Sequence, residues 1–168
     1  MPAQFATFFL GNDYFGIDVL LVREINQNMV VTEVDPSPVY IVGLMNLRGQ
    51  IVTVADLKVK LGIEDKAGVS GENCIVLKTD EELDRLRDKG FGVSKTAKDI
   101  VGLMVDRIGD MVTVHEDEME SAPANVNGVD SRYIRGIVKL DGKLLVVLNV
   151  QTVLAMENCN QTADCYKV

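Results

Sequence analysis

An internal repeat is the feature of this 168-residue sequence that most restricts its fold. Residues 40–57, YIVGLMNLRGQIVTVADL, align without a gap to residues 133–150, YIRGIVKLDGKLLVVLNV. The identical positions, which include both glycines of each copy, are Tyr40/Tyr133, Ile41/Ile134, Gly43/Gly136, Leu47/Leu140, Gly49/Gly142 and Val54/Val147. In each copy a Gly-centred turn separates two apolar runs, which is the pattern of a β-hairpin. The duplication therefore predicts a chain with two similar halves.

A similar apolar segment precedes each copy, at residues 15–25 (FGIDVLLVREI) and 101–114 (VGLMVDRIGDMVTV). Short strands separated by turns at this density are typical of small barrels or a sandwich. We expect a mainly β fold in which two small barrels share an apolar seam, as one domain over residues 1–168. The first barrel is expected at about 15–78 and the second at about 100–150, with the N-terminal and C-terminal segments crossing between the lobes.

The segment between the halves, residues 79–99, is rich in charged residues and predicts a short surface helix followed by a flexible loop. Thr79 and Glu82 have the spacing of a capping box, and Gly90 ends the helical pattern. We expect this segment to be an insertion in the β fold. Residues 157–168 form a polar tail in which Cys159 and Cys165 have no predicted role.

Two further short helices are expected directly after the hairpins. One spans Leu57 to Leu61 and is closed by Gly62, and the other begins at Val150 and extends to Met156. Cys74, in the apolar run NCIVLK, is expected to be buried as a small hydrophobic residue.

The charge of the chain bears on its partners. The net charge is −8 and Lys and Arg do not cluster, whereas a protein that binds nucleic acid presents a basic face to the phosphates. The same negative net charge disfavours binding to anionic membranes. No apolar run approaches the roughly 20 residues of a membrane span. We therefore expect a cytoplasmic protein with no nucleic-acid partner and no membrane insertion.

The residue types that carry catalysis are sparse. His115 is the one histidine, and it lies in an acidic connection without a second His or Cys at metal-ligand spacing. The run from Gly43 to Gly49 lacks the Lys-Ser/Thr pair of a phosphate-binding loop. No catalytic residue, metal or cofactor is predicted, and a non-enzymatic interaction module is favoured. An enzymatic or small-molecule-binding barrel around His115 is the alternative from a different class.

Arg48 lies at the turn of the first hairpin, where the second copy has Asp141. Its planar guanidinium suits bidentate contacts with carboxylates at protein interfaces. Residues 15–25 end in Arg23-Glu24-Ile25, so Glu24 is a candidate partner for Arg48 if the two segments are neighbours. The other interpretation is that both side chains are only solvated at turns.

The same segments resemble the CheW family, the coupling proteins of bacterial chemotaxis. GIDVLLVREI, YIVGLMNLRGQIVTVADLKVKLG, VGLMVDRIGDMVTV and YIRGIVKLDGKLLVVLNV occur in the order of that family, from about Phe5 to Met156. The run NLRG-x-I-x-x-V-x-D-L is specific to it. The resemblance implies two SH3-like five-stranded β-barrels around a shared apolar seam. It also implies a non-catalytic adaptor that joins chemoreceptor tips to the regulatory, CheW-like domain of the histidine kinase CheA, at cytoplasmic receptor arrays.

Receptor-binding positions of the family fall on Val19, Val22, Glu24, Ile25 and Arg48 of this sequence, and the resemblance identifies no kinase-binding residue here. The chain departs from the family in residues 79–99, which replace a tight hairpin. Around Pro123, basic and aromatic residues that form ring contacts between copies in some members are replaced by Glu120 and Asn125. An adaptor for a pathway that controls pili, gliding or gene expression is the alternative function.

Overall fold

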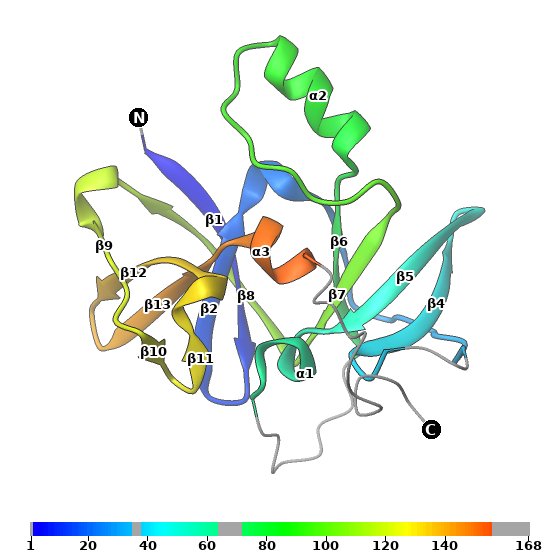
Figure 1. The fold of residues 1–168 in the computed structure, drawn as a ribbon, viewed down its shortest axis with the longest axis horizontal. Coiled ribbons are helices and arrows are strands. Elements are labelled where there is room, and N and C mark those ends of the chain that lie inside the picture. Colours follow the sequence, from blue (N-terminus) through cyan, green and yellow to red (C-terminus); the bar gives the residue numbers. More distant parts are fainter. Residues whose placement is uncertain (1, 35–37, 64–71, 156–168) are drawn as a thin grey trace.

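The structure is a computed structural model that describes residues 2–34, 38–63 and 72–155, with a six-stranded and a five-stranded sheet side by side (Figure 1). The six-stranded sheet consists, in spatial order, of β8 (Arg107–Val114), β1 (Ala3–Leu10), β2 (Asp13–Asp18), β13 (Lys143–Leu148), β12 (Ile134–Leu140) and β9 (Met119–Glu120). The five-stranded sheet consists of β3 (Val22–Asn26), β6 (Asn73–Leu77), β7 (Val101–Val105), β5 (Gln50–Asp56) and β4 (Ile41–Leu47). A mainly β fold with two sheets is thus confirmed.

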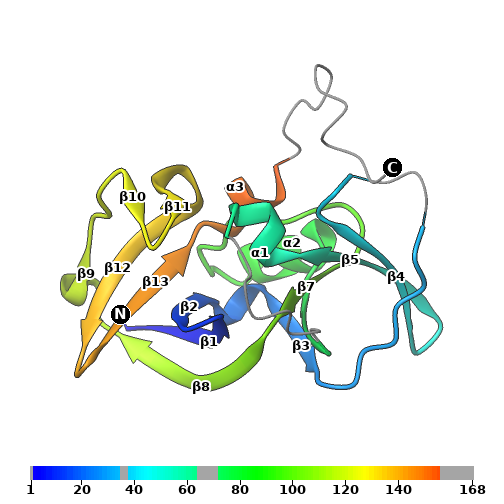
Figure 2. The same cartoon turned by 90° about the horizontal axis from the view of Figure 1, so that it is seen from below.

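Short elements connect these strands. The α-helices are α1 (Leu57–Leu61), α2 (Asp80–Asp88) and α3 (Val150–Leu154). The 3-10 turns are η1 (Val19–Leu21), η2 (Glu116–Glu118) and η3 (Ser131–Tyr133), and a small ribbon pairs β10 (Asn125–Val126) with β11 (Val129–Asp130). Seen after a 90° turn, α1 and α3 lie between the two sheets (Figure 2). Among the described residues, no helix is both long and apolar enough to cross a bilayer.

The sequence repeat corresponds to two equivalent hairpins, β4–β5 and β12–β13. Gly43 lies opposite Val54 in the first, Gly136 lies opposite Val147 in the second, and each register shifts just before the glycine. This shift is a β-bulge, which bends the strand and increases its twist. The duplication therefore extends to the irregularities of the two hairpins.

The repeated glycines make room for a crossing segment. A Cβ at Gly43 would lie 2.1 Å from the carbonyl oxygen of Thr32, and a Cβ at Gly136 would lie 2.6 Å from Cγ of Met119. At Gly43 the neighbour is backbone, so only glycine allows this approach. At Gly136 the nearest neighbour is the Met119 side chain, with the Glu120 carbonyl oxygen at 3.0 Å, so a side chain there would force Met119 to move.

Each hairpin continues into a capped helix. The Asp56 N–H donates to the Tyr40 carbonyl at 2.7 Å, and the Asn149 N–H donates to the Tyr133 carbonyl at 2.8 Å. The side chains of Asp56 and Asn149 then accept hydrogen bonds from the first turns of α1 and α3. Gly62 ends α1 with a φ of 75°, as expected from the sequence.

The strands of the two halves are interleaved along the chain. The chain crosses from one sheet to the other between β2 and β3, and again between β7 and β8. β2 pairs in parallel with β13, and β7 pairs in parallel with β5. Strand pairing thus differs from the expected boundaries, since residues 13–18 belong with the second half and residues 101–105 with the first. In each sheet, the parallel neighbour of the repeated hairpin is the strand that precedes a crossing between the sheets.

The hydrophobic cluster at the seam contains buried side chains from both sheets. Phe8 and Phe15 stack at 6.0 Å between ring centroids, and this cluster extends to Leu57 on α1 and Leu103 on β7. Cys74 is completely buried, as expected. The seam is therefore apolar.

One ion pair is buried at this seam. Lys58 Nζ lies 2.7 Å from Asp106 Oδ1, and the Gly11 N–H donates to the other carboxylate oxygen at 2.6 Å. α1 of one half is thereby linked to the β7–β8 junction and the β1–β2 turn of the other.

Residues 79–99 contain the predicted helix, and both bonds of the Thr79–Glu82 capping box are present. Helix α2 ends at Asp88, just before Gly90, which has a φ of 93°. Leu83 on its inner face is completely buried, so the helix is joined to the core by more than its ends. Cys159 and Cys165 lie outside the described residues.

Candidate functional site

The candidate site forms where β3 meets the turn of the β4–β5 hairpin. β3 and β4 are the two edges of the five-stranded sheet, and the sheet curls until side chains from β3 reach this turn. Arg48 Nη1 donates to Glu24 Oε2 at 2.9 Å, and Arg48 Nη2 donates to Glu24 Oε1 at 3.1 Å. The contact predicted between Glu24 and Arg48 is therefore present, in the bidentate geometry that suits a guanidinium and a carboxylate.

The two members of this pair differ in exposure. The Arg48 side chain is 77% exposed, whereas the Glu24 side chain is 20% exposed. The bonds to Glu24 use two of the five N–H donors of the guanidinium. Glu24 thus orients the arginine, and the outer edge of the guanidinium is open to a partner.

The turn itself has an unusual backbone. Arg48 and Gly49 both have positive φ, of 51° and 84°, which defines the two-residue type I′ turn of tight hairpins. The Gly49 N–H donates to Asn46 Oδ1 at 3.0 Å and fixes the turn from inside. This geometry directs Arg48 away from the sheet, as the sequence predicted.

Half-buried and exposed apolar side chains occur on the elements that carry or flank the charged pair. Val22 on β3 is half-buried against the core, and Ile25 on the same strand is 40% exposed. Val19 lies one element earlier, in η1, and is half-buried. Ile51 is 59% exposed because β5 alternates and directs its neighbour Val52 into the core. Ile51 was not among the predicted contact residues, although this alternation could have identified it.

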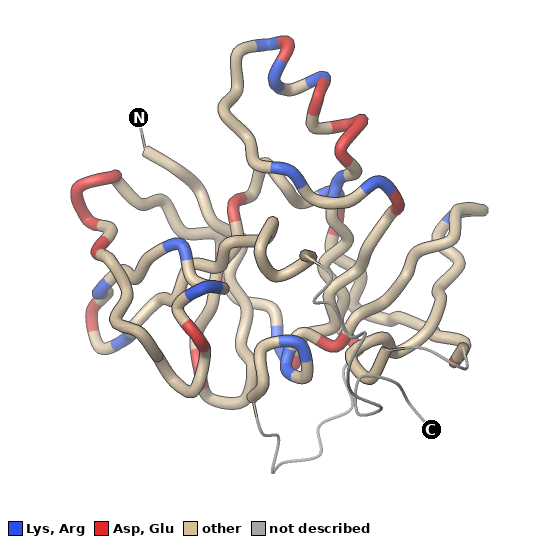
Figure 3. The backbone as a smooth tube through the Cα atoms, viewed as in Figure 1, with Lys and Arg blue, Asp and Glu red and all other residues tan. Residues whose placement is uncertain are grey.

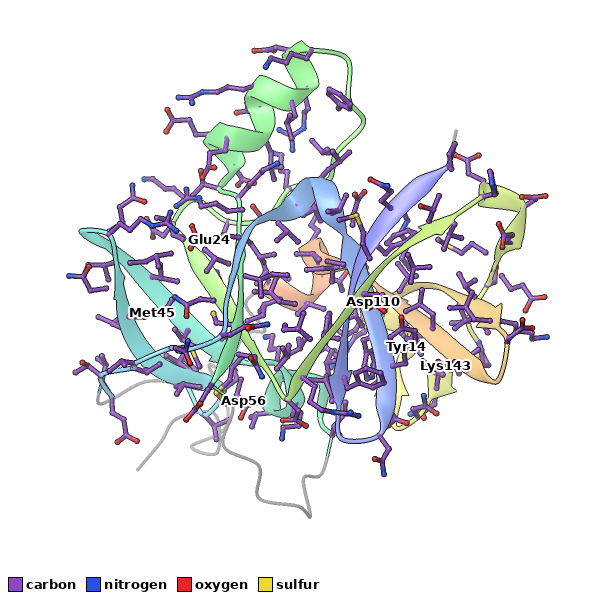
Figure 4. All side chains as sticks on the ribbon, turned by 180° about the vertical axis from the view of Figure 1, so that it is seen from behind. Tyr14, Glu24, Met45, Asp56, Asp110 and Lys143 are labelled. Carbon is purple, nitrogen blue, oxygen red and sulfur yellow. The ribbon has the colours of Figure 1, made fainter. Side chains whose placement is uncertain are left out.

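Three polar residues of the site were not predicted as a group. Arg23 donates from Nη1 to Gln50 Oε1 at 3.1 Å and from Nε to Glu82 Oε2 at 3.3 Å. Figure 4 shows Glu24, the neighbour of Arg23, between the β4–β5 hairpin and the base of α2. Contacts between segments this distant in sequence leave no local signal, and Glu82 was recognisable only as a capping residue.

Two groups of the five-stranded sheet have perturbed pKa values. Burial, with a smaller contribution from the negative charge of Glu24, raises the pKa of the Cys74 thiol to about 12. Burial also raises the pKa of Asp56, and the charge of Asp106 adds to this effect. Amide hydrogen bonds from Val59 and Lys58, and the charge of Lys58, oppose the shift. Cys74 therefore stays a neutral thiol in the folded protein and is a poor nucleophile.

Two cavities of about 340 Å³ each open along the seam. One is mainly apolar and lies between α3, β5 and β7, with Ala55, Leu103 and Val153 in its wall. The other is more polar and lies beside η1, with Asp18 and Arg135 in its wall. Neither is lined by a residue of the predicted receptor-binding set.

His115 is exposed and precedes η2, where its backbone N–H donates to Glu118 at 3.1 Å. Figure 3 shows acidic residues gathered along this turn. In the part of the chain that the structure describes, no group of three His, Cys, Asp or Glu side chains could hold a metal ion.

The fold and the exposed surface around Glu24 and Arg48, which we call the rim, define a class of protein. It is that of two-sheet β domains that present a charged and apolar surface. Residues 4–158 match the CheW-like domain, so the chain belongs to the CheW-like family. The family resemblance predicted from the sequence is thereby confirmed.

Curated relatives and a solved structure agree with this assignment. The chain is 30% identical to a chemotaxis protein CheW of Klebsiella aerogenes, with 92% of this chain and 82% of that protein covered. It is 27% identical to a chemotaxis protein CheW of Treponema pallidum, with 96% and 87% covered. The crystal structure of scaffolding protein TtCheW from Thermoanaerobacter tengcongensis superposes with a TM-score of 0.74 at 25% identity, covering 93% of this chain and 90% of that one.

Proposed function

We propose that this protein is a non-catalytic chemotaxis adaptor that couples the cytoplasmic tips of chemoreceptors to the histidine kinase CheA. Membership of the CheW-like family and the names of its relatives, chemotaxis protein CheW and a scaffolding protein, support this role. The role requires binding at two surfaces and no chemical step, and it locates the protein at cytoplasmic receptor arrays.

The observation that carries the proposal is the bidentate Glu24–Arg48 pair. These residues are far apart in the sequence, and the fold brings them together, while β3 and β5 also expose the apolar residues Ile25 and Ile51. An oriented arginine beside apolar side chains is a common composition for the centre of a protein interface. We assign receptor binding to this surface, with Val19, Val22, Glu24, Ile25 and Arg48 as its contact residues.

Affinity at such a surface comes from few residues. The receptor tip would bury Ile25 and the exposed edge of Val22, and would offer carbonyl or carboxylate oxygens to the outer N–H groups of Arg48. Because Glu24 already orients the guanidinium, little side-chain freedom remains to be lost on binding.

Calorimetric titration with a receptor-tip fragment tests this assignment. Arg48→Ala and Val22→Ala should each weaken binding by about 1–3 kcal/mol, the range of interface residues that dominate affinity. Arg132→Ala, an exposed arginine of the other half, is the matched control and should bind as the wild type does. Unchanged affinity in both test variants, with the fold intact by circular dichroism, would remove the proposed mechanism.

A further inference from the structure

The insertion between β6 and β7 is firmly attached to the domain. We call residues 79–99 the α2 arm. Its Leu83 is completely buried, and Leu86 and Val93 pack against the same core. Arg87 donates to the carbonyls of Val93 at 3.3 Å and Ser94 at 3.1 Å, so the segment after the helix folds back on it. The flexible loop expected from the composition is thus pinned along its length.

The base of the α2 arm is closed as well. The Asp80 N–H donates to the Ala97 carbonyl at 2.9 Å, and the Thr96 N–H donates to Asp80 Oδ1 at 2.8 Å. The two ends of the arm therefore meet, and α2 has a defined position relative to β3 and the β4–β5 hairpin (Figure 1). A side chain on α2 can consequently act as a fixed support.

Glu82 is the residue of α2 that faces the candidate site. Its carboxylate accepts hydrogen bonds from Nε and Nη2 of Arg23 while it also completes the capping box with Thr79. Arg23 reaches in the other direction to Gln50. The side chains of Arg23 and Glu82 are only 22% and 28% exposed, so this contact is partly shielded from solvent. A chain of polar contacts thus runs from α2 through β3 to the hairpin.

A β-bulge makes this arrangement possible. Successive side chains of a regular strand point to opposite faces, but the register of β3 shifts between Val22 and Glu24. The two consecutive residues Arg23 and Glu24 therefore both reach the same hairpin turn. Glu24 holds Arg48, and Arg23 holds Gln50, which directly follows the turn.

We propose that Glu82 is a positioning residue of the docking surface, which acts by holding Arg23 against Gln50 and so fixing the turn that carries Arg48. This inference rests on the proposed function and adds to it a residue, on the α2 arm, that positions the docking turn. A turn that is already fixed loses less conformational freedom when a partner binds. Glu82 thereby contributes to affinity without itself touching the partner.

The variant Glu82→Gln isolates this effect. Glutamine also serves at this position of a capping box, so the helix cap is retained and only the charge facing Arg23 is removed. Receptor-tip affinity should fall by about fivefold, the upper end expected for a partly exposed ion pair. Glu81→Gln is the matched control, since Glu81 is 85% exposed and pairs along the helix with Arg85 at 3.7 Å. That control should bind as the wild type does.

A double-mutant cycle separates positioning from a general loss of structure. If Glu82 acts through Arg23, Glu82→Gln should cause no further loss of affinity in an Arg23→Ala background. Equal losses in both backgrounds would overturn the inference, and so would a Glu82→Gln variant with wild-type affinity.

Hydrogen exchange on the free protein tests the same inference without a partner. Backbone amides of residues 46–51 should exchange faster in Glu82→Gln than in Glu81→Gln, because the turn has lost its support. Equal exchange in the two variants contradicts the positioning role. If neither Arg48→Ala nor Val22→Ala weakens receptor binding, the proposed mechanism fails, whereas this exchange measurement still decides the role of Glu82.

Discussion

Arg48 occupies a backbone conformation that residues with a side chain rarely adopt. Its φ of 51° lies in the left-handed region, which disfavours L-residues by about 1–2 kcal/mol. Asn-Gly is the preferred pair for such a turn, and here the pair is Arg-Gly. In the second hairpin only Gly142 of the corresponding pair has positive φ. Strain of this kind is typical of functional positions, and it agrees with a recognition role for the Arg48 side chain.

The strained backbone at Arg48 leads to a prediction that separates its effect on stability from its role in recognition. Asn tolerates the left-handed conformation and Ala does not, so Arg48→Asn should be more stable than Arg48→Ala by about 1 kcal/mol in urea unfolding. Both variants lack the guanidinium and should lose receptor affinity to the same extent. An affinity that follows stability across the two variants would mean that Arg48 only maintains the turn.

Arg48 could be predicted from sequence as a paired, exposed residue. The second copy of the repeat has Asp141 at this position, so the arginine is not required to form the hairpin. The contacts by which Arg23, Gln50 and Glu82 support this turn could not be predicted from sequence. Those contacts depend on a bulge in β3 and on the placement of α2, and a sequence pattern records neither.

At the scale of elements, the repeat predicted both hairpins and the helices that follow them. Caps and turns are set by local chemistry, which is why Gly62, Gly90 and the Thr79–Glu82 box behaved as expected. Crossing of the N-terminal segment between the lobes was expected, but its partner strand was not predictable, because parallel pairing of β2 with β13 joins residues more than a hundred positions apart. Strand pairing of this kind is decided by the whole core.

The two copies cap their helices differently, and the difference predicts a pH effect. Asp56 caps α1, whereas Asn149 caps α3. Burial raises the folded-state pKa of Asp56 above 3.8, so its stabilising contribution is complete below that pH. The contribution is lost as pH rises through the folded pKa, because the buried carboxyl must then ionise.

Replacing Asp56 by the residue of the other copy should remove this loss. Asparagine caps as well as aspartate, so the unfolding free energy of Asp56→Asn relative to wild type should increase from pH 4 to pH 7. Urea unfolding at several pH values measures it. Asp130→Asn, the same exchange at the cap of η3 where the residue is exposed, is the control. A difference between Asp56→Asn and wild type that does not change with pH would contradict the expected effect.

At the scale of the whole molecule, the interleaved strands make the two halves one structural unit. The Lys58–Asp106 pair and the shared apolar core join them at the seam. Such a unit presents different surfaces at fixed relative positions, which an adaptor requires. We propose that the rim around Arg48, on the first half, binds the receptor tip, and that a different surface of the same domain binds the kinase.

Retention of the kinase on an immobilised receptor-tip fragment tests that claim most directly. The regulatory domain of CheA should be retained only when this protein is present. Arg48→Ala should abolish most of the retention, while the same variant binds the kinase domain in solution as the wild type does. Retention of the kinase domain without this protein, or undiminished retention with Arg48→Ala, would contradict the account.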